Sequence, residues 1–173
     1  MEDMNDRPNE PPMPEPLAYF ITWATYGTWL PGDKRGWVDY RHGWQLPDPQ
    51  LELEAAARMT EDACYLNPEQ RAGMEAQIRE TCLHRGWELH AVNCRSNHMH
   101  VVVTAPQKPK VVRAQLKAWC TRKLKDLARQ HHPRRPVREN WWAERGSQRY
   151  VNIHAGLEAA IIYTRDGQDV PRS

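Results

Sequence analysis

The chain combines short runs of β-branched and aromatic residues with longer amphipathic stretches, after a polar start. Four runs of the first kind are predicted as strands: 17–25, 87–93, 98–104 and 147–153. Three stretches are predicted as helices: 67–84, 111–130 and 157–166. The resulting order, β-α-β-β-α-β-α, predicts an α+β domain of the ferredoxin-like, split β-α-β type. In this fold a single antiparallel sheet carries helices on one face, which leaves the other face able to hold a site.

Capping and turn residues mark where these elements begin and end. Asn67, Pro68 and Glu69 are typical of a helix start, with a capping side chain, a proline in the first turn and an acid near the positive helix end. Gly86 is expected to end that helix. Prolines and glycines interrupt residues 28–48, so we expect a long irregular loop there, pinned by three tryptophans. These are Trp29, Trp37 and Trp44.

The composition predicts one folded domain behind a flexible start. Residues 1–16 are rich in Pro, Glu, Asp and Asn, which predicts a disordered N-terminal segment. Residues 17–173 are expected to form a single domain. The sequence has no run of about 18 apolar residues, and its acidic start lacks the pattern of a signal peptide. We therefore expect a soluble, cytoplasmic protein with no membrane partner.

Charge is segregated along the chain, although the formal net charge is only +2. Residues 108–138 contain eleven lysines and arginines and a single acid, Asp126. This segment creates a local positive field that suits a polyanion such as nucleic acid. Its helical part is predicted to be amphipathic, with the basic residues on the exposed side and Trp119 packed in the core. The alternative to DNA binding is that these basic residues form a solvated helix face. The four cysteines form no C-x-x-C pair, so we expect reduced, mostly buried thiols.

The sequence SNHMHVVVT, residues 96–104, carries the strongest local chemical signal. His98 and His100 are two residues apart in a predicted strand, so both imidazoles project from the same face together with Val102. Met99, Val101 and Val103 are then left to pack on the other face. Two neighbouring imidazoles suit a divalent metal ion. The alternative is one histidine hydrogen-bonded in the core and one exposed.

The histidine pair does not stand alone. A histidine-hydrophobe-histidine strand, a following basic amphipathic helix and a tyrosine on the last helix together resemble the HUH endonucleases. More narrowly, the chain resembles the single-tyrosine transposases, the insertion-sequence family that includes the REP-associated tyrosine transposases. The resemblance covers residues 17–168, and the opening FITWATYGTWLPGDKRGWVD is similar to the start of many members.

The resemblance implies a nucleophile. In the family a tyrosine hydroxyl attacks a DNA phosphodiester and forms a covalent 5′-phosphotyrosine, which a later 3′-hydroxyl reverses. The matching residue is Tyr163, on the helix after the last predicted strand. Taken without the family, a half-buried tyrosine that closes the core is the favoured interpretation of Tyr163. Tyr150 is the rival candidate, but cross-strand packing explains it more simply.

The resemblance also implies a metal shell. Relatives place a glutamine one helical turn beyond the tyrosine, and Gln168 is the counterpart here. It departs from the pattern because it follows five residues after the tyrosine and comes after Gly167. Either the helix ends or loosens at Gly167 so that Gln168 swings back, or another oxygen, from Asp166 or water, completes the site. Imidazole and oxygen ligands suit Mg²⁺ or Mn²⁺ better than a structural zinc ion.

Basic and aromatic residues are the candidates for holding DNA. Family members recognise imperfect DNA hairpins, so the resemblance implies single-stranded DNA with hairpin structure as the partner. Relatives are often dimers, so the resemblance also allows a homodimer. Trp141 and Trp142 could stack bases. The candidate DNA-binding residues are Lys108, Lys110, Arg113, Lys117, Arg134, Arg135, Arg138, Arg35 and Arg41.

Taken together, the sequence predicts a metal-dependent single-strand DNA endonuclease and strand transferase, a transposase or domesticated transposase. Tyr163 is the predicted nucleophile, and His98, His100 and Gln168 are the predicted metal ligands. One alternative is a non-catalytic module that binds single-stranded nucleic acid on the same fold. A second is a metal-dependent phosphodiesterase that uses water and forms no covalent intermediate.

Overall fold

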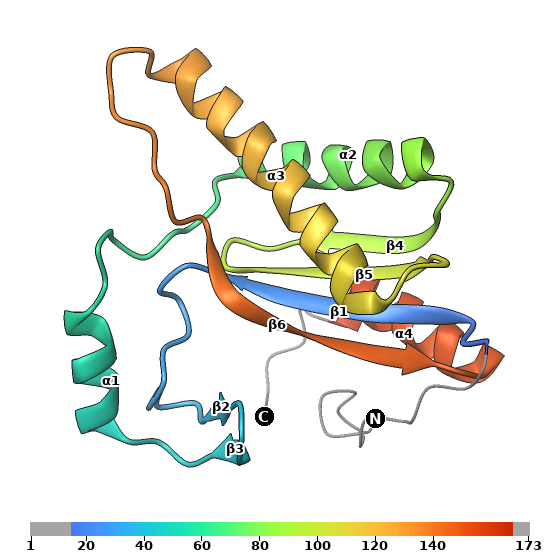
Figure 1. Ribbon diagram of the computed structural model, residues 1–173, viewed down its shortest axis with the longest axis horizontal. Coiled ribbons are helices and arrows are strands. Elements are labelled where there is room, and N and C mark those ends of the chain that lie inside the picture. The colour runs from blue at the N-terminus through green and yellow to red at the C-terminus, as the bar shows by residue number, and fades with distance from the viewer. Residues whose placement is uncertain (1–14, 168–173) are drawn as a thin grey trace.

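A four-stranded antiparallel sheet with the strand order β4-β5-β1-β6 is the frame of the molecule (Figure 1). The structure is a computed structural model that describes residues 15–167. The strands are β1 (Ala18–Thr25), β4 (Glu88–Cys94), β5 (His98–Thr104) and β6 (Trp142–Val151). Two helices, α2 (Pro68–Arg85) and α3 (Pro109–His131), connect them, and α4 (His154–Asp166) follows β6. This order confirms the predicted ferredoxin-like fold with an additional C-terminal helix.

The sheet separates two hydrophobic clusters. The larger one lies between the sheet and helices α2 and α3, and includes Met99, Val101 and Val103 of β5. The smaller one lies under α4 and includes Val102 of β5 and Phe20 of β1. Successive side chains of β5 therefore alternate between the clusters, as predicted for this strand. In Figure 1, α2 and α3 are seen on the near face of the sheet and α4 on the far face.

Local capping explains the limits of α2. The Asn67 side chain accepts a hydrogen bond from the Gln70 backbone N–H, and the Gln70 side chain accepts one from the Asn67 backbone, which completes a capping box. At the other end Gly86 adopts the left-handed conformation with φ 69°. Both predicted ends of this helix are confirmed.

The segment between β1 and α2 contains structure that the sequence pattern did not predict. Two short strands, β2 (Trp37–Asp39) and β3 (Gly43–Gln45), form a hairpin within the predicted irregular loop, and helix α1 (Pro49–Ala57) follows. Every residue of α1 is exposed or half-buried, so this helix lacks an amphipathic pattern. The predicted pinning by tryptophans is confirmed for two rings. The indole N–H of Trp29 donates to the Gly36 carbonyl at 2.8 Å, and that of Trp37 donates to the Leu46 carbonyl at 3.1 Å.

Strand β6 begins five residues earlier than predicted. Trp142 pairs with Thr25 across a register shift in the β1–β6 ladder. Its ring packs edge-on against Trp23 at a centroid distance of 6.0 Å, and its N–H donates to the Thr121 hydroxyl at 2.9 Å. These tertiary contacts extend the strand through residues that the proline- and arginine-rich sequence marked as loop. The prediction of a loop up to residue 145 was therefore wrong at its end.

The cysteine thiols lie inside the fold. All four cysteines are buried and free, as predicted: Cys64, Cys82, Cys94 and Cys120. Burial raises the pKa of the Cys82 thiol to about 11, which keeps it protonated and unreactive.

Within residues 15–167, no helix is both long enough and apolar enough to cross a membrane.

Gly146 provides a test of the β1–β6 pairing. A Cβ atom at this position would lie 2.4 Å from the Thr22 carbonyl oxygen and 2.9 Å from Trp23 Cβ, so the strands would have to separate. We expect Gly146→Ala to lower the free energy of unfolding by about 1–3 kcal/mol in urea unfolding. The control is Gly156→Ala in α4, where the nearest atom is 3.5 Å away; this change should stay within about 1 kcal/mol of wild type. Equal effects of the two changes would contradict the close approach.

Candidate active site

Strand β5 brings two imidazoles together on the face that α4 partly covers. The ring centroids of His98 and His100 are 4.8 Å apart, with the rings nearly perpendicular at 87°. His100 is only 7% exposed, whereas His98 is half-buried. The register places His100 opposite Thr22 and His98 opposite Ala24 in β1. The two histidines thus form a pair with one inner and one outer ring.

Both rings have an oxygen partner at Nδ1. The Nδ1 atom of His100 lies 2.9 Å from the Thr22 hydroxyl oxygen, and that of His98 lies 2.6 Å from Oδ1 of Asn97. A neutral imidazole that donates from Nδ1 keeps its lone pair on Nε2, and this tautomer can bind a metal ion through Nε2. The arrangement is therefore compatible with two imidazole ligands.

Burial also determines the charge of the inner ring. Desolvation, together with the nearby His98 and Arg95, lowers the pKa of His100 to about 3. His100 is consequently neutral across the physiological pH range, and the neutral imidazole is the form that coordinates metal ions.

Tyr163 lies beside this pair in the same chain. Its ring centroid is 5.7 Å from that of His100 and 6.0 Å from that of Phe20, in edge-to-face contact with both rings. Phe20 in turn stacks on His100 at 5.6 Å. Tyr163 is half-buried and packs on the cluster under α4, so its two aromatic contacts hold its ring next to His100.

Tyr150 lies on the opposite face of the sheet. It pairs with Tyr19 across the β1–β6 ladder, and the two rings meet edge-on at 5.7 Å. Its ring packs against the larger cluster. The predicted cross-strand packing of Tyr150 is confirmed, and the sheet separates this phenol from the histidine pair.

The predicted third ligand, Gln168, lies outside the described residues. Helix α4 ends at Asp166 with Gly167 as its C-cap, which agrees with the interpretation that the helix ends there. Among residues 15–167, no cluster of three or more His, Cys, Asp or Glu side chains could hold a metal ion. Among the described residues, His98 and His100 therefore fit two ligands of a metal site.

The sequence of this chain matches the model of a known protein family. The family model described as "Transposase IS200 like" matches residues 56–157, more than half of the chain, and this match includes both histidines. The chain belongs to the IS200-like transposase family. This result confirms the resemblance to single-tyrosine transposases and assigns the chain an enzymatic role as a transposase. The matched region ends before Tyr163.

Two solved structures resemble this IS200-like transposase. One is a REP-associated tyrosine transposase bound to a REP hairpin, at 12% identity and a TM-score of 0.51, covering 91% of this chain and 70% of that chain. This structural match supports the ferredoxin-like fold of the chain. The other is a provisionally named transposase from Deinococcus radiodurans R1, at 20% identity and a TM-score of 0.46, covering 95% and 100% of the two chains. No curated protein matches the sequence.

Two of the predicted DNA-binding residues of the transposase donate hydrogen bonds to strand β6. Arg113 donates to the Gly146 carbonyl at 2.8 Å, and Lys117 donates to the Ala143 carbonyl at 2.7 Å. Burial, with the charge of Arg113 nearby, lowers the pKa of Lys117 to about 8. Both side chains are half-buried, so the expectation that the basic residues of this helix all lie on its exposed side was wrong.

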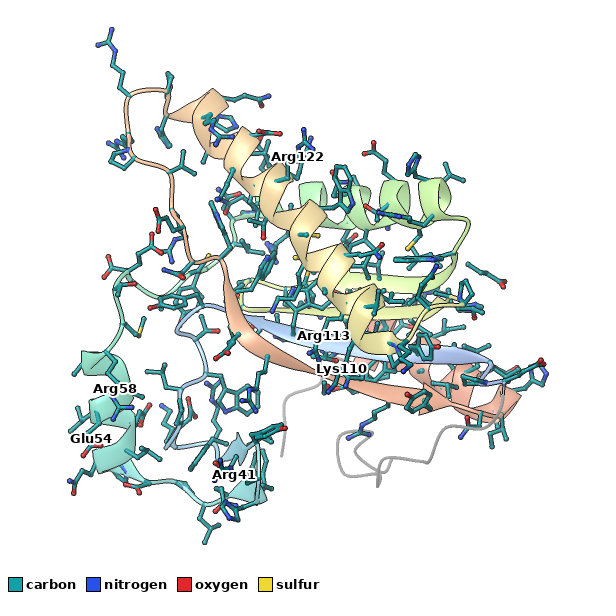
Figure 2. The ribbon with its side chains drawn as sticks, in the orientation of Figure 1. Arg41, Glu54, Arg58, Lys110, Arg113 and Arg122 are labelled. Atoms are coloured by element: carbon teal, nitrogen blue, oxygen red, sulfur yellow. The ribbon has the colours of Figure 1, made fainter. Side chains whose placement is uncertain are left out.

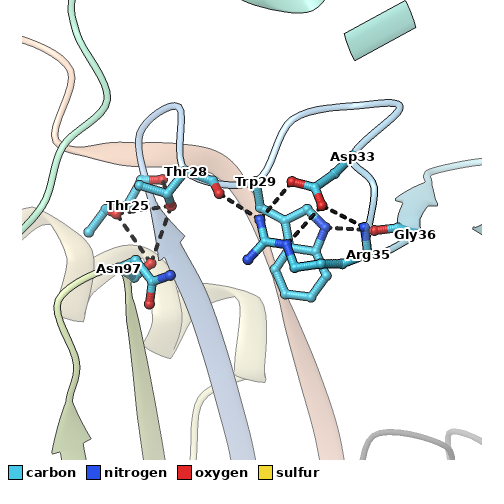
Figure 3. Close-up of polar contacts among 7 residues, drawn as sticks. All are labelled: Thr25, Thr28, Trp29, Asp33, Arg35, Gly36 and Asn97. Atoms are coloured by element: carbon cyan, nitrogen blue, oxygen red, sulfur yellow. Dashed lines mark hydrogen bonds and ion pairs between the residues drawn. The ribbon is translucent and has the colours of Figure 1, made fainter. Parts of the chain in front are cut away.

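Arg35 of the transposase is part of the loop after β1 (Figure 3). Its guanidinium forms an ion pair with Asp33 at 2.6 Å and donates to the Thr28 carbonyl at 2.8 Å. It also lies over the Trp29 ring, 4.5 Å from the centroid. These contacts hold the loop together. Arg41 is exposed near the β2–β3 hairpin (Figure 2).

The other predicted DNA-binding residues are more accessible. Lys108, Lys110, Arg134 and Arg135 are exposed, and Arg138 is half-buried and donates to the Asn140 carbonyl at 3.1 Å. In Figure 2, Lys110 and Arg113 lie near the start of α3 beside β6, and Arg122 lies toward the other end of the helix. The exposed cations thus extend along α3 and the loop that follows it.

The tryptophans differ from the sequence expectations. Trp141 is 5% exposed and belongs to the larger core, and Trp142 packs on Trp23, so neither indole is presented for base stacking. Trp119 is 36% exposed, with the Arg122 guanidinium 5.4 Å from its ring centroid, and is not the core residue that we expected. Helical periodicity assigned Trp119 to the apolar face because it lies three residues after Leu116, which is buried.

Sequence reasoning missed three neighbours of the histidine pair. Phe20 and Thr22 reach it from β1, and only the strand register identifies them. Asn97 directly precedes His98 in the sequence SNHMH, so the sequence alone could have identified it as a neighbour of the histidine pair. The register also places Arg149 opposite Phe20, which puts this cation on the same face of the sheet as His100.

The Asp33–Arg35 pair predicts an acid-sensitive contribution to stability. The hydrogen bonds from Arg35 hold the pKa of Asp33 below its ordinary value, so the pair stabilises the fold above the unfolded-state pKa. This contribution is lost as the pH falls through the lowered pKa of the folded state. We expect Asp33→Asn to lower the free energy of unfolding by about 1 kcal/mol at about pH 7, and the difference to shrink at about pH 3. Urea unfolding at both pH values measures it.

The control for this experiment is Asp62→Asn, which alters an exposed carboxylate. It should change the unfolding free energy little at either pH. A difference between wild type and Asp33→Asn that is unchanged in acid would contradict the ion-pair contribution.

Proposed function

We propose that this transposase is a metal-dependent single-strand DNA endonuclease and strand transferase in which Tyr163 is the nucleophile. The observation that carries the proposal is the grouping of three side chains on one face of one chain. The His98 and His100 rings are 4.8 Å apart, and the Tyr163 ring is 5.7 Å from His100. A phenol beside a potential metal ligand pair combines a nucleophile with a group that could stabilise charge on a phosphate, and together these can support covalent cleavage of a phosphodiester.

The proposed reaction has two balanced steps. The Tyr163 oxygen attacks the phosphorus, and the bond between phosphorus and the 3′ oxygen breaks. The phenolic proton is lost, and the departing 3′ oxygen gains a proton as a hydroxyl. In the second step a 3′-hydroxyl attacks the 5′-phosphotyrosine, which forms a new phosphodiester and returns the phenol. The number of phosphoester bonds is conserved, so strand transfer needs no energy source.

His98 and His100 would hold the divalent cation, with Gln168 as the proposed third ligand. Such an ion, Mg²⁺ or Mn²⁺, would polarise the scissile phosphate and stabilise its developing negative charge. The neutral state of His100 and the oxygen partners at both Nδ1 atoms support this assignment. Phe20 contacts both His100 and Tyr163, and so keeps the phenol and the inner imidazole in a fixed relation.

Single-stranded DNA with hairpin structure is the proposed partner. The structural relative bound to a REP hairpin supports this choice, as does the excess of exposed cations in and after α3. Lys108, Lys110, Arg134 and Arg135 are the proposed phosphate contacts because their side chains are exposed. Arg113 and Lys117 are better explained as supports of β6, which their hydrogen bonds already engage.

Replacing the nucleophile gives the main prediction. With a single-stranded hairpin DNA and Mn²⁺, wild type should form a DNA–protein adduct that survives denaturation. Tyr163→Phe should form this adduct at least about 1000-fold more slowly. The matched control is Tyr150→Phe, since this tyrosine lies on the other face of the sheet and should leave the reaction intact.

The same experiment separates the two alternatives. Cleavage without an adduct that persists in Tyr163→Phe would identify a phosphodiesterase that uses water. Hairpin binding without cleavage by wild type would identify a non-catalytic binding module. Either result would contradict the assignment of Tyr163.

The basic loop gives a second prediction. Replacing Arg134 and Arg135 together by glutamine should weaken hairpin binding and reduce the slope of log affinity against log salt by about 1.5, because two phosphate contacts are lost. The control replaces two exposed arginines of α2, Arg79 and Arg85, by glutamine. Equal slopes in the two double variants, measured by fluorescence anisotropy, would exclude the loop as a DNA contact.

A further inference from the structure

Strand β1 supplies a partner for the inner histidine. Thr22 lies directly opposite His100 in the β1–β5 ladder, and its hydroxyl oxygen is 2.9 Å from Nδ1 of the imidazole. His100 is buried, and Phe20, two residues before Thr22, stacks on its ring at 5.6 Å. Since both partners are on paired strands, the ladder holds this hydrogen bond in place. The imidazole has little freedom to rotate away from it.

The turn after β1 supplies the support for the outer histidine (Figure 3). Oδ1 of Asn97 is 2.6 Å from Nδ1 of His98. The Asn97 carbonyl accepts hydrogen bonds from the Thr25 backbone N–H at 2.8 Å and from the Thr25 hydroxyl at 3.2 Å. Thr25 is fully buried, and its hydroxyl is 3.1 Å from that of Thr28. The backbone from which the Asn97 side chain projects is therefore fixed.

Both partners act on the choice between two tautomers. A neutral imidazole carries one proton, on Nδ1 or on Nε2, and only the other nitrogen has a lone pair for a metal ion. The Asn97 amide oxygen can only accept, so its contact with Nδ1 of His98 stabilises the proton on that nitrogen. The Thr22 hydroxyl can accept or donate, and when it accepts it stabilises the proton on Nδ1 of His100. Hydrogen bonds of this kind to metal-binding histidines orient the ring and increase its basicity.

We propose that Thr22 and Asn97 are positioning residues that hold His100 and His98 as Nδ1-protonated tautomers, so that Nε2 of each ring carries the lone pair that would bind a cation. The inference rests on the proposed function, because it concerns the same metal site. It adds two residues to the site and assigns a role to the β1 register and to the Thr25–Thr28 turn. Thr22 and Asn97 would act through the two histidines and would not themselves bind the cation.

A matched pair of variants tests the role of Thr22. Thr22→Val has nearly the same shape and suits a strand, but lacks the hydroxyl, whereas Thr22→Ser keeps it. We expect Thr22→Val to weaken Mn²⁺ binding by about 10–100-fold, measured by titration calorimetry, and Thr22→Ser to stay within about threefold of wild type. Thermal unfolding checks that both variants fold. Equal Mn²⁺ affinity of a folded Thr22→Val and wild type would overturn the role of Thr22.

The corresponding pair at position 97 is Asn97→Leu and Asn97→Asp. The carboxylate of Asn97→Asp can still accept the hydrogen bond from Nδ1 of His98, whereas leucine cannot. We expect Asn97→Leu to lose Mn²⁺ affinity and Asn97→Asp to keep it. A folded Asn97→Leu that binds Mn²⁺ like wild type would overturn the role of Asn97.

A metal-free measurement separates this inference from the proposed function. Nitrogen-15 NMR of the histidine rings reports which nitrogen carries the proton. We expect the Nδ1-protonated form to dominate at His98 and His100 in wild type, and the Nε2-protonated form to gain at His100 in Thr22→Val. Nε2-protonated rings in wild type would overturn the inference even if the enzyme cleaves DNA. Nδ1-protonated rings that shift in Thr22→Val would support it even if no tyrosine adduct forms.

Discussion

The antiparallel pairing of β1 with β5 is the constraint on which the candidate site depends. It places Thr22 opposite His100, and it places Phe20 on the same face of the sheet, where it contacts His100 and Tyr163. A slip of one residue in this register would move the partner side chains to the other face. The large core under α2 and α3 prevents such a slip, because Ile21, Trp23 and Met99 are almost completely buried there. The packing of one face thus determines the chemistry available on the other.

Helix α4 completes the arrangement from within the same chain. It follows β6 directly, and Ala160 packs in the smaller cluster with Phe20 and Val102. This packing brings Tyr163 next to His100, one turn of helix beyond the buried Ala160. Gly167 then ends the helix, and a Cβ atom at this position would lie 2.9 Å from the Tyr163 ring. The close approach of the Tyr163 ring explains why a residue without a side chain occupies position 167, four residues after the tyrosine.

Much of this arrangement could be predicted from the sequence, because it depends on local patterns. Alternation in HMHVVVT identified the strand and the shared face of His98 and His100, and capping residues identified both ends of α2. Other features depend on tertiary contacts that a linear pattern does not contain. Helix α1 buries no hydrophobic face, and the start of β6 is strand because Trp142 packs on Trp23. The Thr22–His100 contact requires the register, which the sequence alone did not give.

The basic residues show why charge in a sequence is ambiguous. Arg113 and Lys117 belong to the same positive stretch as Arg134 and Arg135, yet their side chains bind carbonyl oxygens of β6. The guanidinium of Arg35 likewise binds groups within the loop after β1, namely the Asp33 carboxylate and the Thr28 carbonyl. The total charge of the stretch favours DNA as a partner, whereas burial and hydrogen bonding decide which individual cations can contact it.

Mapping the covalent intermediate tests the central claim most directly. Wild-type enzyme would be incubated with hairpin DNA and Mn²⁺, and the DNA–protein adduct digested with nuclease and trypsin. The tryptic peptide 150–165 contains both Tyr150 and Tyr163, and tandem mass spectrometry can distinguish them. The expected product is a nucleotide linked through its 5′-phosphate to Tyr163. A nucleotide on Tyr150 or on any other residue, or DNA cleavage without a linked peptide, would contradict it.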